Sequence, residues 1–359
     1  MIKVAIMGFG TIGSGVAEVL DINKKSIAAR VGDEVELKYV LDLRDFEGDP
    51  IQSKIVHDYK VIAEDPEVSI VVETMGGVEP AYTFVKTMLE AGKHVTTSNK
   101  ALVAAKGAEL IALAKEKNVH ILPVDSEHSA IMQCLRGEKH AEIERILLTA
   151  SGGPFFEKEI TDDITPAEAL RHPTWKMGPK ITIDSATMMN KGFEVIEARW
   201  LFNVPVEKVQ VVIHRQSIVH SMVEFRDGSI MANIAPPDME IPIAYALSYP
   251  ERMPAPHRLD IFAMKALEFK APDEEKFPCL RLAIEAAKSG HSAQVVLNAA
   301  NEVLVARFLA GGLRFTDIPS GVGAMLEQHA AHALGGVDEV LALDEEIRRR
   351  TEEWTETRQ

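Results

Sequence analysis

Residues 3–13 read Lys-Val-Ala-Ile-Met-Gly-Phe-Gly-Thr-Ile-Gly, an apolar run followed at once by Gly8, Gly10 and Gly13. The run at 3–7 predicts a buried strand, and the apolar spacing over 12–29 predicts a helix. Glycines between a strand and a helix allow a tight turn, a close approach of backbone to a pyrophosphate, and close packing of the two elements. This stretch therefore predicts a dinucleotide-binding fold at the N-terminus.

Strand and helix patterns continue to alternate up to about residue 124. The further strands are expected at 36–41, 69–73, 94–97 and 120–124, and the further helices at 80–91 and 102–117. Strands that alternate with helices favour a parallel sheet covered on both faces. The fold class expected here is α/β, with a Rossmann-like, doubly wound parallel sheet.

The pattern changes after residue 124. Strand-like segments recur at 145–150, 208–214, 219–225 and 229–233, and helical patterns follow at 282–288, 295–309, 321–332 and 337–354. The first set predicts an α+β catalytic domain and the second a small helical domain. We expect three domains, at 1–124, 125–270 and 271–359.

The cofactor type is left open by the end of the second strand. Asp42 would hold the ribose hydroxyls of NAD, whereas Arg44 would meet the 2′-phosphate of NADP. The residues expected to bind the dinucleotide share a position at the carboxyl end of a strand or in the glycine-rich turn. They are Gly8, Phe9, Gly10, Thr11, Ile12, Gly13, Arg44, Met75, Gly76 and Asn99.

Two of these segments have a plainer interpretation as well. Met75-Gly76-Gly77 follows a strand and either lines the cofactor groove or forms a simple turn. Asn99-Lys100 follows the strand at 94–97, where ligands bind in open α/β sheets, but Lys100 is also placed as an ordinary first residue of a helix.

Residues 1 to about 118 resemble the nucleotide-binding domain of homoserine dehydrogenases. The resemblance rests on GFGTIGSGVAEVL, VLDLRDFEGDP, ETMGGVEPAY and AGKHVTTSNKALVAAKG. It implies reduction of aspartate semialdehyde with NADH or NADPH.

The segment Asp125-Ser126-Glu127 follows the last strand of the first domain. If it is extended, the two carboxylates point the same way and can grip one cation, with a third ligand from elsewhere. Oxygen ligands suit Mg²⁺ or Mn²⁺ rather than zinc. Alone, the same pattern is more often a solvated turn.

Further polar residues gather downstream of this segment. Asn190, Lys191 and Glu194 share one face if their segment is helical, which suits a phosphorylated, metal-chelated polyol or a plain surface ion pair. Residues 151–154, Ser-Gly-Gly-Pro, supply hydroxyl and backbone donors of the kind that bind phosphate, or form a turn.

From about residue 121 to the C-terminus the chain closely resembles 1-deoxy-D-xylulose 5-phosphate reductoisomerases. The resemblance rests on LPVDSEHSAI, LLTASGGPFF, HPTWKMGPKITIDSATMMNKGFEVIEARWLFN and HRQSIVHSMVEF, and on long segments after residue 235. It implies that the substrate rearranges its carbon skeleton on a divalent metal and is then reduced by NADPH. The implied product is 2-C-methyl-D-erythritol 4-phosphate, an isoprenoid precursor.

The resemblance also implies roles for individual residues. The implied metal ligands are Asp125, Glu127 and Glu194, and the implied catalytic residues are these three with Lys100 and His172. The implied substrate contacts are Ser126, Ser151, His172, Trp175, Ser185, Asn190 and Lys191. Residues 172–177 would form a mobile lid, and Gly178 would approach the cofactor.

The first third departs from the usual reductoisomerase pattern. Its glycine-rich turn is GFGTIG, and Ala101 follows Asn99-Lys100 where that family carries a glutamate. Two alternatives therefore stay open beside the reductoisomerase. They are a semialdehyde reductase of homoserine dehydrogenase type and an inactive mosaic that only binds a dinucleotide.

Composition and charge restrict the partners. Among 359 residues there are 54 acidic and 39 basic ones, which gives a net charge of −15, and the longest run of Lys and Arg is the three-residue segment Arg348–Arg350, which acidic residues flank. Nucleic-acid binding needs clustered cations, so no nucleic-acid partner is expected. No stretch reaches the roughly 18 apolar residues of a membrane span, so no membrane partner is expected.

The two cysteines, Cys134 and Cys279, show no ligand spacing and are expected to be reduced thiols. The N-terminus reads as a strand rather than a leader peptide. We therefore expect a cytoplasmic location, and the family resemblance implies a homodimer.

Overall fold

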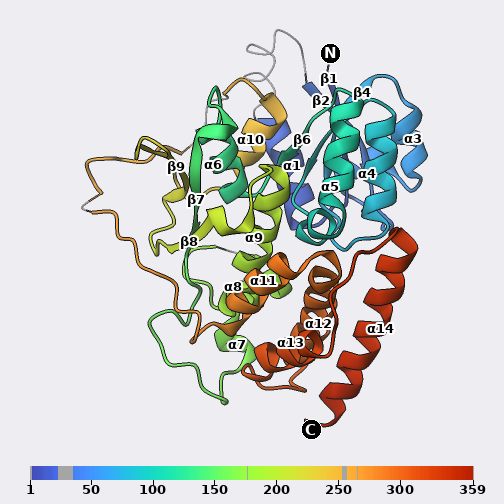
Figure 1. Ribbon diagram of the computed structural model, residues 1–359. Helices are drawn as coiled ribbons and strands as arrows, with labels where there is room; N and C mark the ends of the chain where they lie inside the picture. The colour runs from blue at the N-terminus through green and yellow to red at the C-terminus, as the bar shows by residue number, and fades with distance from the viewer. Residues whose placement is uncertain (1, 23–34, 176, 253–256, 265, 359) are drawn as a thin grey trace. The chain divides into compact units, whose positions relative to one another are not determined.

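The computed structural model describes residues 2–22, 35–175, 177–252, 257–264 and 266–358. The chain forms two compact units, each made of two stretches of sequence (Figure 1). The first contains Met1–Gly137 and Asn233–Ile261, and the second contains Glu138–Ala232 and Phe262–Gln359. Each unit has its own sheet and its own hydrophobic cluster.

The first unit is built on a six-stranded sheet of order β3-β2-β1-β4-β5-β6, and all its neighbouring pairs are parallel. The strands are β1 (Ile2–Met7), β2 (Val35–Leu41), β3 (Ile55–Val56), β4 (Val68–Glu73), β5 (His94–Thr97) and β6 (Ile121–Pro123). The order reverses between β1 and β4, where ligands bind in sheets of this type. The predicted doubly wound sheet is confirmed, and only the short β3 was missed.

Helices flank this sheet on both faces. They are α1 (Thr11–Ile22), α3 (Tyr59–Glu64), α4 (Ala81–Glu90), α5 (Lys100–Glu116), α6 (Ser126–Cys134) and α10 (Glu240–Ser248). The late segment α10 packs beside α1, so Ile243 and Leu247 enter the same buried cluster as Val4 and Val16. The predicted helix at 12–29 is observed up to Ile22, and its remaining residues lie outside the described part of the chain.

The second unit contains a four-stranded sheet of order β10-β9-β7-β8. Its strands are β7 (Ile143–Ala150), β8 (Val209–Ile213), β9 (Val219–Phe225) and β10 (Ile230–Ile234). The pair β7–β8 is parallel and the pair β7–β9 is antiparallel. The helices α7 (Pro166–Ala169), α8 (Pro179–Ala186) and α9 (Met189–Leu201) occupy the connection from β7 to β8. The predicted α+β arrangement is therefore confirmed.

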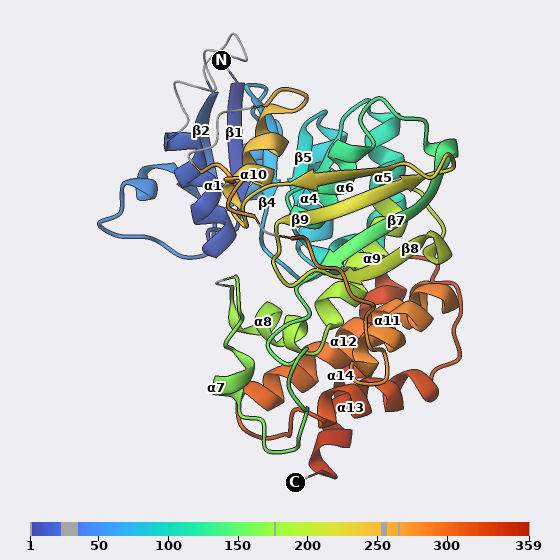
Figure 2. The same ribbon diagram turned by 90° about the vertical axis from the view of Figure 1, so that its left-hand side faces the viewer.

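Four helices complete this unit (Figure 2): α11 (Pro278–Ser289), α12 (His291–Leu309), α13 (Asp317–Glu327) and α14 (Val337–Glu356). Helix α12 contacts α8, α11, α13 and α14, which explains why it is buried on nearly every side. The first three begin about one turn earlier than predicted. In α11 this turn starts at Pro278, whose missing N–H costs nothing at a helix start.

Helices α9 and α11 approach each other closely at Gly192. A Cβ atom added there would lie 2.3 Å from the Cβ of Ala283. Because α9 carries three of the expected site residues, this contact fixes the position of that helix within its unit. No helix in the described part of the chain is long and apolar enough to cross a membrane.

We expect Gly192→Ala to lower the free energy of unfolding by roughly 1–3 kcal/mol, because extra atoms in a packed contact force the helices apart. Urea unfolding measures the change. Gly323→Ala in α13 is the matched control, since a Cβ there meets Leu282 at an ordinary 3.9 Å. The control should be neutral or stabilising by up to about 1 kcal/mol. Equal effects of the two substitutions would contradict the close contact.

Candidate functional site

The glycine-rich turn after β1 has the geometry that a dinucleotide needs. Gly8 has φ +97°, and a Cβ there would lie 2.9 Å from the Met75 side chain. A Cβ at Gly13 would lie 2.0 Å from the Gly8 carbonyl oxygen, so α1 packs directly on the turn. A Cβ at Gly10 would meet nothing within 4 Å, which leaves that backbone open to a ligand. The three glycines thus serve turn, packing and approach respectively.

The structure separates the roles of Asp42 and Arg44. The Asp42 carboxylate accepts the Phe9 N–H (2.8 Å) and three hydrogen bonds from the N–H, Nε and Nη2 of Arg44. The Arg44 side chain beside it holds the pKa of Asp42 well below its usual range. Arg44 also donates to the Phe9 carbonyl (3.0 Å) and lies over the Phe46 ring, yet its side chain stays 62% exposed. The group presented to solvent at this strand end is therefore a guanidinium.

The segment Met75-Gly76-Gly77 is tied down more firmly than a plain turn. Glu73 at the end of β4 is fully buried and accepts hydrogen bonds from Met75 N–H (2.8 Å), Thr97 Oγ1 (2.5 Å) and Asn99 Nδ2 (3.2 Å). Burial raises the pKa of Glu73. Asn99 also donates to the Gly77 carbonyl (2.7 Å) and caps α5 by accepting the Leu102 N–H. Asn99 thus orients the loop through its side chain, and Glu73 was missed in the sequence.

Lys100 and Asp125 form an ion pair of 2.5 Å in the first unit. Asp125 is the N-cap of α6 and accepts the N–H groups of Glu127 (3.1 Å) and His128 (3.4 Å), and its Oδ1 also lies 3.2 Å from His128 Nδ1. Ser126 Oγ donates to the Glu127 carboxylate (2.5 Å). The prediction that 125–127 are extended was wrong. A helix begins at Ser126 because Asp125 caps it, and the cap brings Asp125 to the Glu127 backbone.

In the second unit, Asn190, Lys191 and Glu194 share one face of α9, as predicted. Glu194 is 1% exposed and accepts Asn190 Nδ2 (2.6 Å) on one oxygen and Lys191 Nζ on the other. Lys191 is itself buried. A buried Lys–Glu pair is expensive to desolvate and is weak evidence for a purely stabilising role.

The loop after β7 presents a serine hydroxyl with a defined direction. Ser151 Oγ accepts the Gly153 N–H (3.2 Å) and lies 3.1 Å from His172 Nε2. Gly152 and Gly153 have φ of +77° and +66°, and a Cβ at Gly153 would lie 2.5 Å from the Ser185 carbonyl oxygen. The loop is thus packed against the end of α8, and Ser151 and Ser185 lie in adjoining segments.

His172 is held in one tautomer by the segment that follows it. Its Nδ1 accepts the backbone N–H groups of Thr174 (3.1 Å) and Trp175 (2.9 Å), so the proton of the neutral ring is on Nε2 and is donated to Ser151. With two donors on its oxygen, Ser151 has its own hydroxyl hydrogen left to donate. The Trp175 ring lies near His220, and Gly178 is the N-cap of α8.

A cation that the sequence reasoning missed lies beside this loop. Arg215 Nη1 donates to the carbonyl oxygens of Ser151 (2.8 Å) and Gly153 (2.6 Å). It is brought there by the parallel pairing of β7 with β8, which the local sequence pattern does not show. Ser151 and Arg215 follow their carboxyl ends, which meet at one edge of the sheet.

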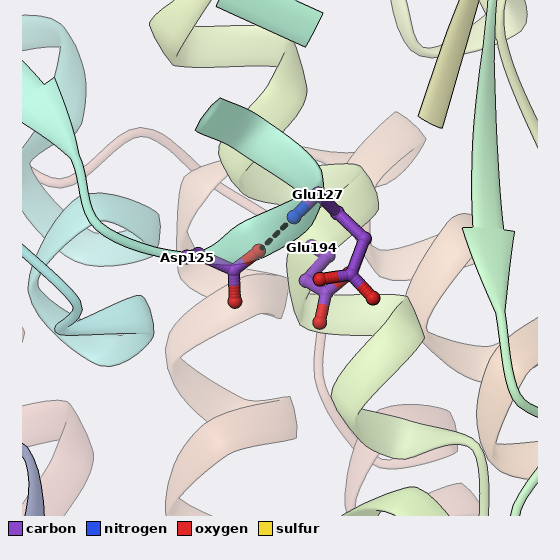
Figure 3. A group of neighbouring side chains, drawn as sticks. All are labelled: Asp125, Glu127 and Glu194. Carbon is purple, nitrogen blue, oxygen red and sulfur yellow. Dashed lines mark hydrogen bonds between the residues drawn. The ribbon is translucent and has the colours of Figure 1, made fainter. Parts of the chain in front are cut away.

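Figure 3 draws the three carboxylates assigned to a metal. Asp125 and Glu127 belong to the start of α6, and Glu194 belongs to α9. Each of the three is a carboxylate of the kind that can hold a metal ion, two in the first unit and one in the second. Their all-oxygen chemistry fits Mg²⁺ or Mn²⁺.

Three family models match the chain. Residues 121–202 match the 1-deoxy-D-xylulose 5-phosphate reductoisomerase C-terminal domain, and residues 234–350 match the DXP reductoisomerase C-terminal domain. Residues 8–123 match the NAD-binding domain of homoserine dehydrogenase. Both predicted resemblances are therefore confirmed.

The 1-deoxy-D-xylulose 5-phosphate reductoisomerase of Pelodictyon phaeoclathratiforme is 50% identical over 286 residues, which cover 79% of this chain and 75% of that protein. The enzyme of Lachnospira eligens is 46% identical over 349 residues, which cover 89% of this chain and 90% of that protein. The second match necessarily includes much of the first third. One reductoisomerase therefore matches both the N-terminal third and the rest of this chain.

Solved structures of reductoisomerases match the fold of this chain over nearly its whole length. A DOX-P reductoisomerase in complex with NADPH, fosmidomycin and magnesium is 33% identical, with a TM-score of 0.86 over 99% of this chain and 98% of that one. The Zymomonas mobilis reductoisomerase in complex with NADPH has the same TM-score and identity, over 99% of each chain. The chain therefore belongs to the 1-deoxy-D-xylulose 5-phosphate reductoisomerase family.

Proposed function

We propose that the protein converts 1-deoxy-D-xylulose 5-phosphate into 2-C-methyl-D-erythritol 4-phosphate with a divalent metal and NADPH. The observation that carries this proposal is the buried set on α9, where Glu194 is 1% exposed and is bonded by Asn190 and Lys191. A carboxylate, an amide and an ammonium group on one helix face suit a substrate that is both chelating and phosphorylated.

The proposed metal ligands are Asp125, Glu127 and Glu194. A divalent cation bound to them would polarise the ketone and adjacent hydroxyl of the substrate and stabilise negative charge on oxygen. Lys100 Nζ pairs with Asp125, and it is proposed to donate to a substrate oxygen once that carboxylate has another partner. Ser126, at the start of α6, is proposed to contact the sugar chain.

The proposed phosphate contacts are Ser151, Ser185, Asn190 and Lys191. Ser151 has a hydroxyl hydrogen free for an anion, because its oxygen accepts Gly153 N–H and His172 Nε2–H. His172 keeps that hydroxyl oriented, and Trp175 follows it in the segment proposed to close over the substrate and exclude water.

The proposed cofactor is NADPH, bound by the turn from Gly8 to Gly13, by Met75 and Gly76, and by Gly178. Arg44 is proposed to contact the 2′-phosphate, since both oxygens of Asp42 are already bonded within the protein. Asn99 is proposed to support cofactor binding indirectly, because its side chain donates to the Gly77 carbonyl and so orients the Met75–Gly77 segment.

A second candidate function is a semialdehyde reductase of homoserine dehydrogenase type, which the match at residues 8–123 favours. That match ends before Asp125, so it includes none of the proposed metal or phosphate ligands. The reductoisomerase is therefore the stronger candidate, and the substrate test below separates the two.

We also propose a cytoplasmic homodimer. Both cysteines are free and buried, and burial raises the pKa of the Cys134 thiol to about 11 and that of Cys279 to about 12. Protonated, unpaired thiols suit a reducing compartment. The dimer rests on the family resemblance alone, and light scattering of the purified protein tests it.

We expect purified protein to oxidise NADPH with 1-deoxy-D-xylulose 5-phosphate when Mg²⁺ or Mn²⁺ is present, and not with aspartate semialdehyde. Glu194→Gln should lower kcat on the order of 10²–10³-fold, because a charge-stabilising ligand is lost. Its affinity for NADPH, measured by fluorescence, should not change. Glu302→Gln on α12 is the control and should keep full activity. Oxidation only with the semialdehyde, or an active Glu194→Gln enzyme, would refute the assignment.

We expect Arg44→Ala to raise the Kd for NADPH about 10–100-fold, because charge-assisted hydrogen bonds to the 2′-phosphate are lost. The Kd for NADH should change much less. Arg349→Ala on α14 is the control, since the Arg349 side chain is as exposed as that of Arg44 and pairs with Glu353 on the same helix. An equal increase of the Kd for NADPH and for NADH would show that Arg44 does not bind the 2′-phosphate.

A further inference from the structure

Arg215 lies at the edge of the second sheet where two strands end together. Val209–Ile213 of β8 pairs in parallel with β7, and the His214 N–H donates to the Ala150 carbonyl (2.8 Å) just beyond the paired residues. Ser151 directly follows Ala150, and Arg215 directly follows His214. Parallel pairing therefore places a guanidinium beside the loop that begins at Ser151.

The contacts of Arg215 are with the backbone of this loop. One nitrogen, Nη1, donates to the carbonyl oxygens of both Ser151 and Gly153. The guanidinium also lies over the Phe156 ring, 6.0 Å from its centre. Phe156 in turn fills the space next to Gly152, where a Cβ would be 3.0 Å from it. Arg215 thus fixes both ends of a two-glycine turn whose residues have φ values that side chains rarely adopt.

This arrangement decides where the donors of the loop point. The peptide group is planar and trans, so the N–H of Gly152 points opposite to the Ser151 carbonyl and away from Arg215. A cation on that carbonyl also polarises the peptide and strengthens its N–H as a donor. The Ser151 hydroxyl hydrogen is already left to donate, because Gly153 N–H and His172 occupy its oxygen.

We propose that Arg215 is a positioning residue for the substrate's phosphate group. It holds the Ser151–Gly153 turn in the form that offers a hydroxyl and a backbone N–H to an anion, and it places a positive charge behind them. The inference rests on the proposed function for the identity of the substrate, but the anion-binding property itself does not depend on turnover.

The test uses the full-length protein and inorganic phosphate as the probe. Arg215→Met keeps an apolar stem against Phe156 and removes the donors and the charge. We expect it to weaken phosphate binding, measured by calorimetry, about 10–100-fold, the usual range for lost hydrogen bonds to a charged group. KM for 1-deoxy-D-xylulose 5-phosphate should rise by a similar factor, with a much smaller change in kcat and no change in the Kd for NADPH.

Two further variants separate positioning from general loop stability. Lys276→Met removes a bond of 2.9 Å to the Phe156 carbonyl at the other end of the loop, and it should leave phosphate affinity unchanged. Arg215→Lys should restore part of the affinity, and it provides the comparison if Arg215→Met does not fold. Equal losses in Lys276→Met and Arg215→Met, or unchanged phosphate affinity without Arg215, would overturn the proposal.

The outcomes also distinguish this proposal from the proposed function. Phosphate binding that depends on Arg215, in a protein that does not turn over 1-deoxy-D-xylulose 5-phosphate, would support the positioning role and refute the reductoisomerase. Normal turnover with a KM that does not change when Arg215 is replaced would support the reductoisomerase and refute the positioning role.

Discussion

Parallel pairing of strands is the constraint on which both candidate sites depend. In the first unit the carboxyl ends of β1, β2, β4, β5 and β6 are followed by Gly8, Asp42, Thr74, Ser98 and Val124, and each of these opens a segment with proposed ligand contacts. In the second unit the parallel neighbours β7 and β8 are followed by Ser151 and His214-Arg215. Because parallel strands end at one edge, residues far apart in sequence are delivered to the same place.

Three acids near the candidate sites, Glu73, Asp125 and Glu194, have hydrogen-bond partners within the protein. Glu73 is bonded by a backbone N–H, a hydroxyl and an amide, Asp125 by Lys100 and the start of α6, and Glu194 by Asn190 and Lys191. An isolated charge in such surroundings would be costly, so each is matched inside the protein. On the proposed assignment, a metal ion bound by Asp125 or Glu194 would replace the lysine that is paired with that carboxylate, and the displaced ammonium group would be available to the substrate.

Much of the fold follows from local patterns in the sequence. The predicted strands end within one residue of the observed ends, because most of them are short apolar runs closed by glycine or polar residues. The shared face of Asn190, Lys191 and Glu194 followed from helical spacing alone. The error at 125–127 has a local cause, since an aspartate before an apolar stretch is also a good N-cap. Asp125 and Glu127 come close together both in an extended segment and at the start of a capped helix. The prediction that they bind one metal ion therefore does not depend on the backbone conformation of this segment.

What the sequence could not supply was contact between distant loops. The choice between Asp42 and Arg44 depends on the Phe9 N–H, which lies 33 residues away and takes an Asp42 oxygen. Glu73 reads as an ordinary strand residue until Thr97 and Asn99 are seen to converge on it. Arg215 contacts carbonyl oxygens more than sixty positions earlier in the chain, and no side-chain pattern records a bond to backbone.

The contact of Gly192 with Ala283 has a consequence for variation in this chain. Between α9 and α11 there is room for a single methyl group, and Ala283 occupies it. The two positions are therefore linked: a larger residue at one is compatible with the fold only if the other gives up the space. A helix far along the chain in the C-terminal part of the protein thus limits which sequences can carry the polar face of α9, although it contributes no group to that face.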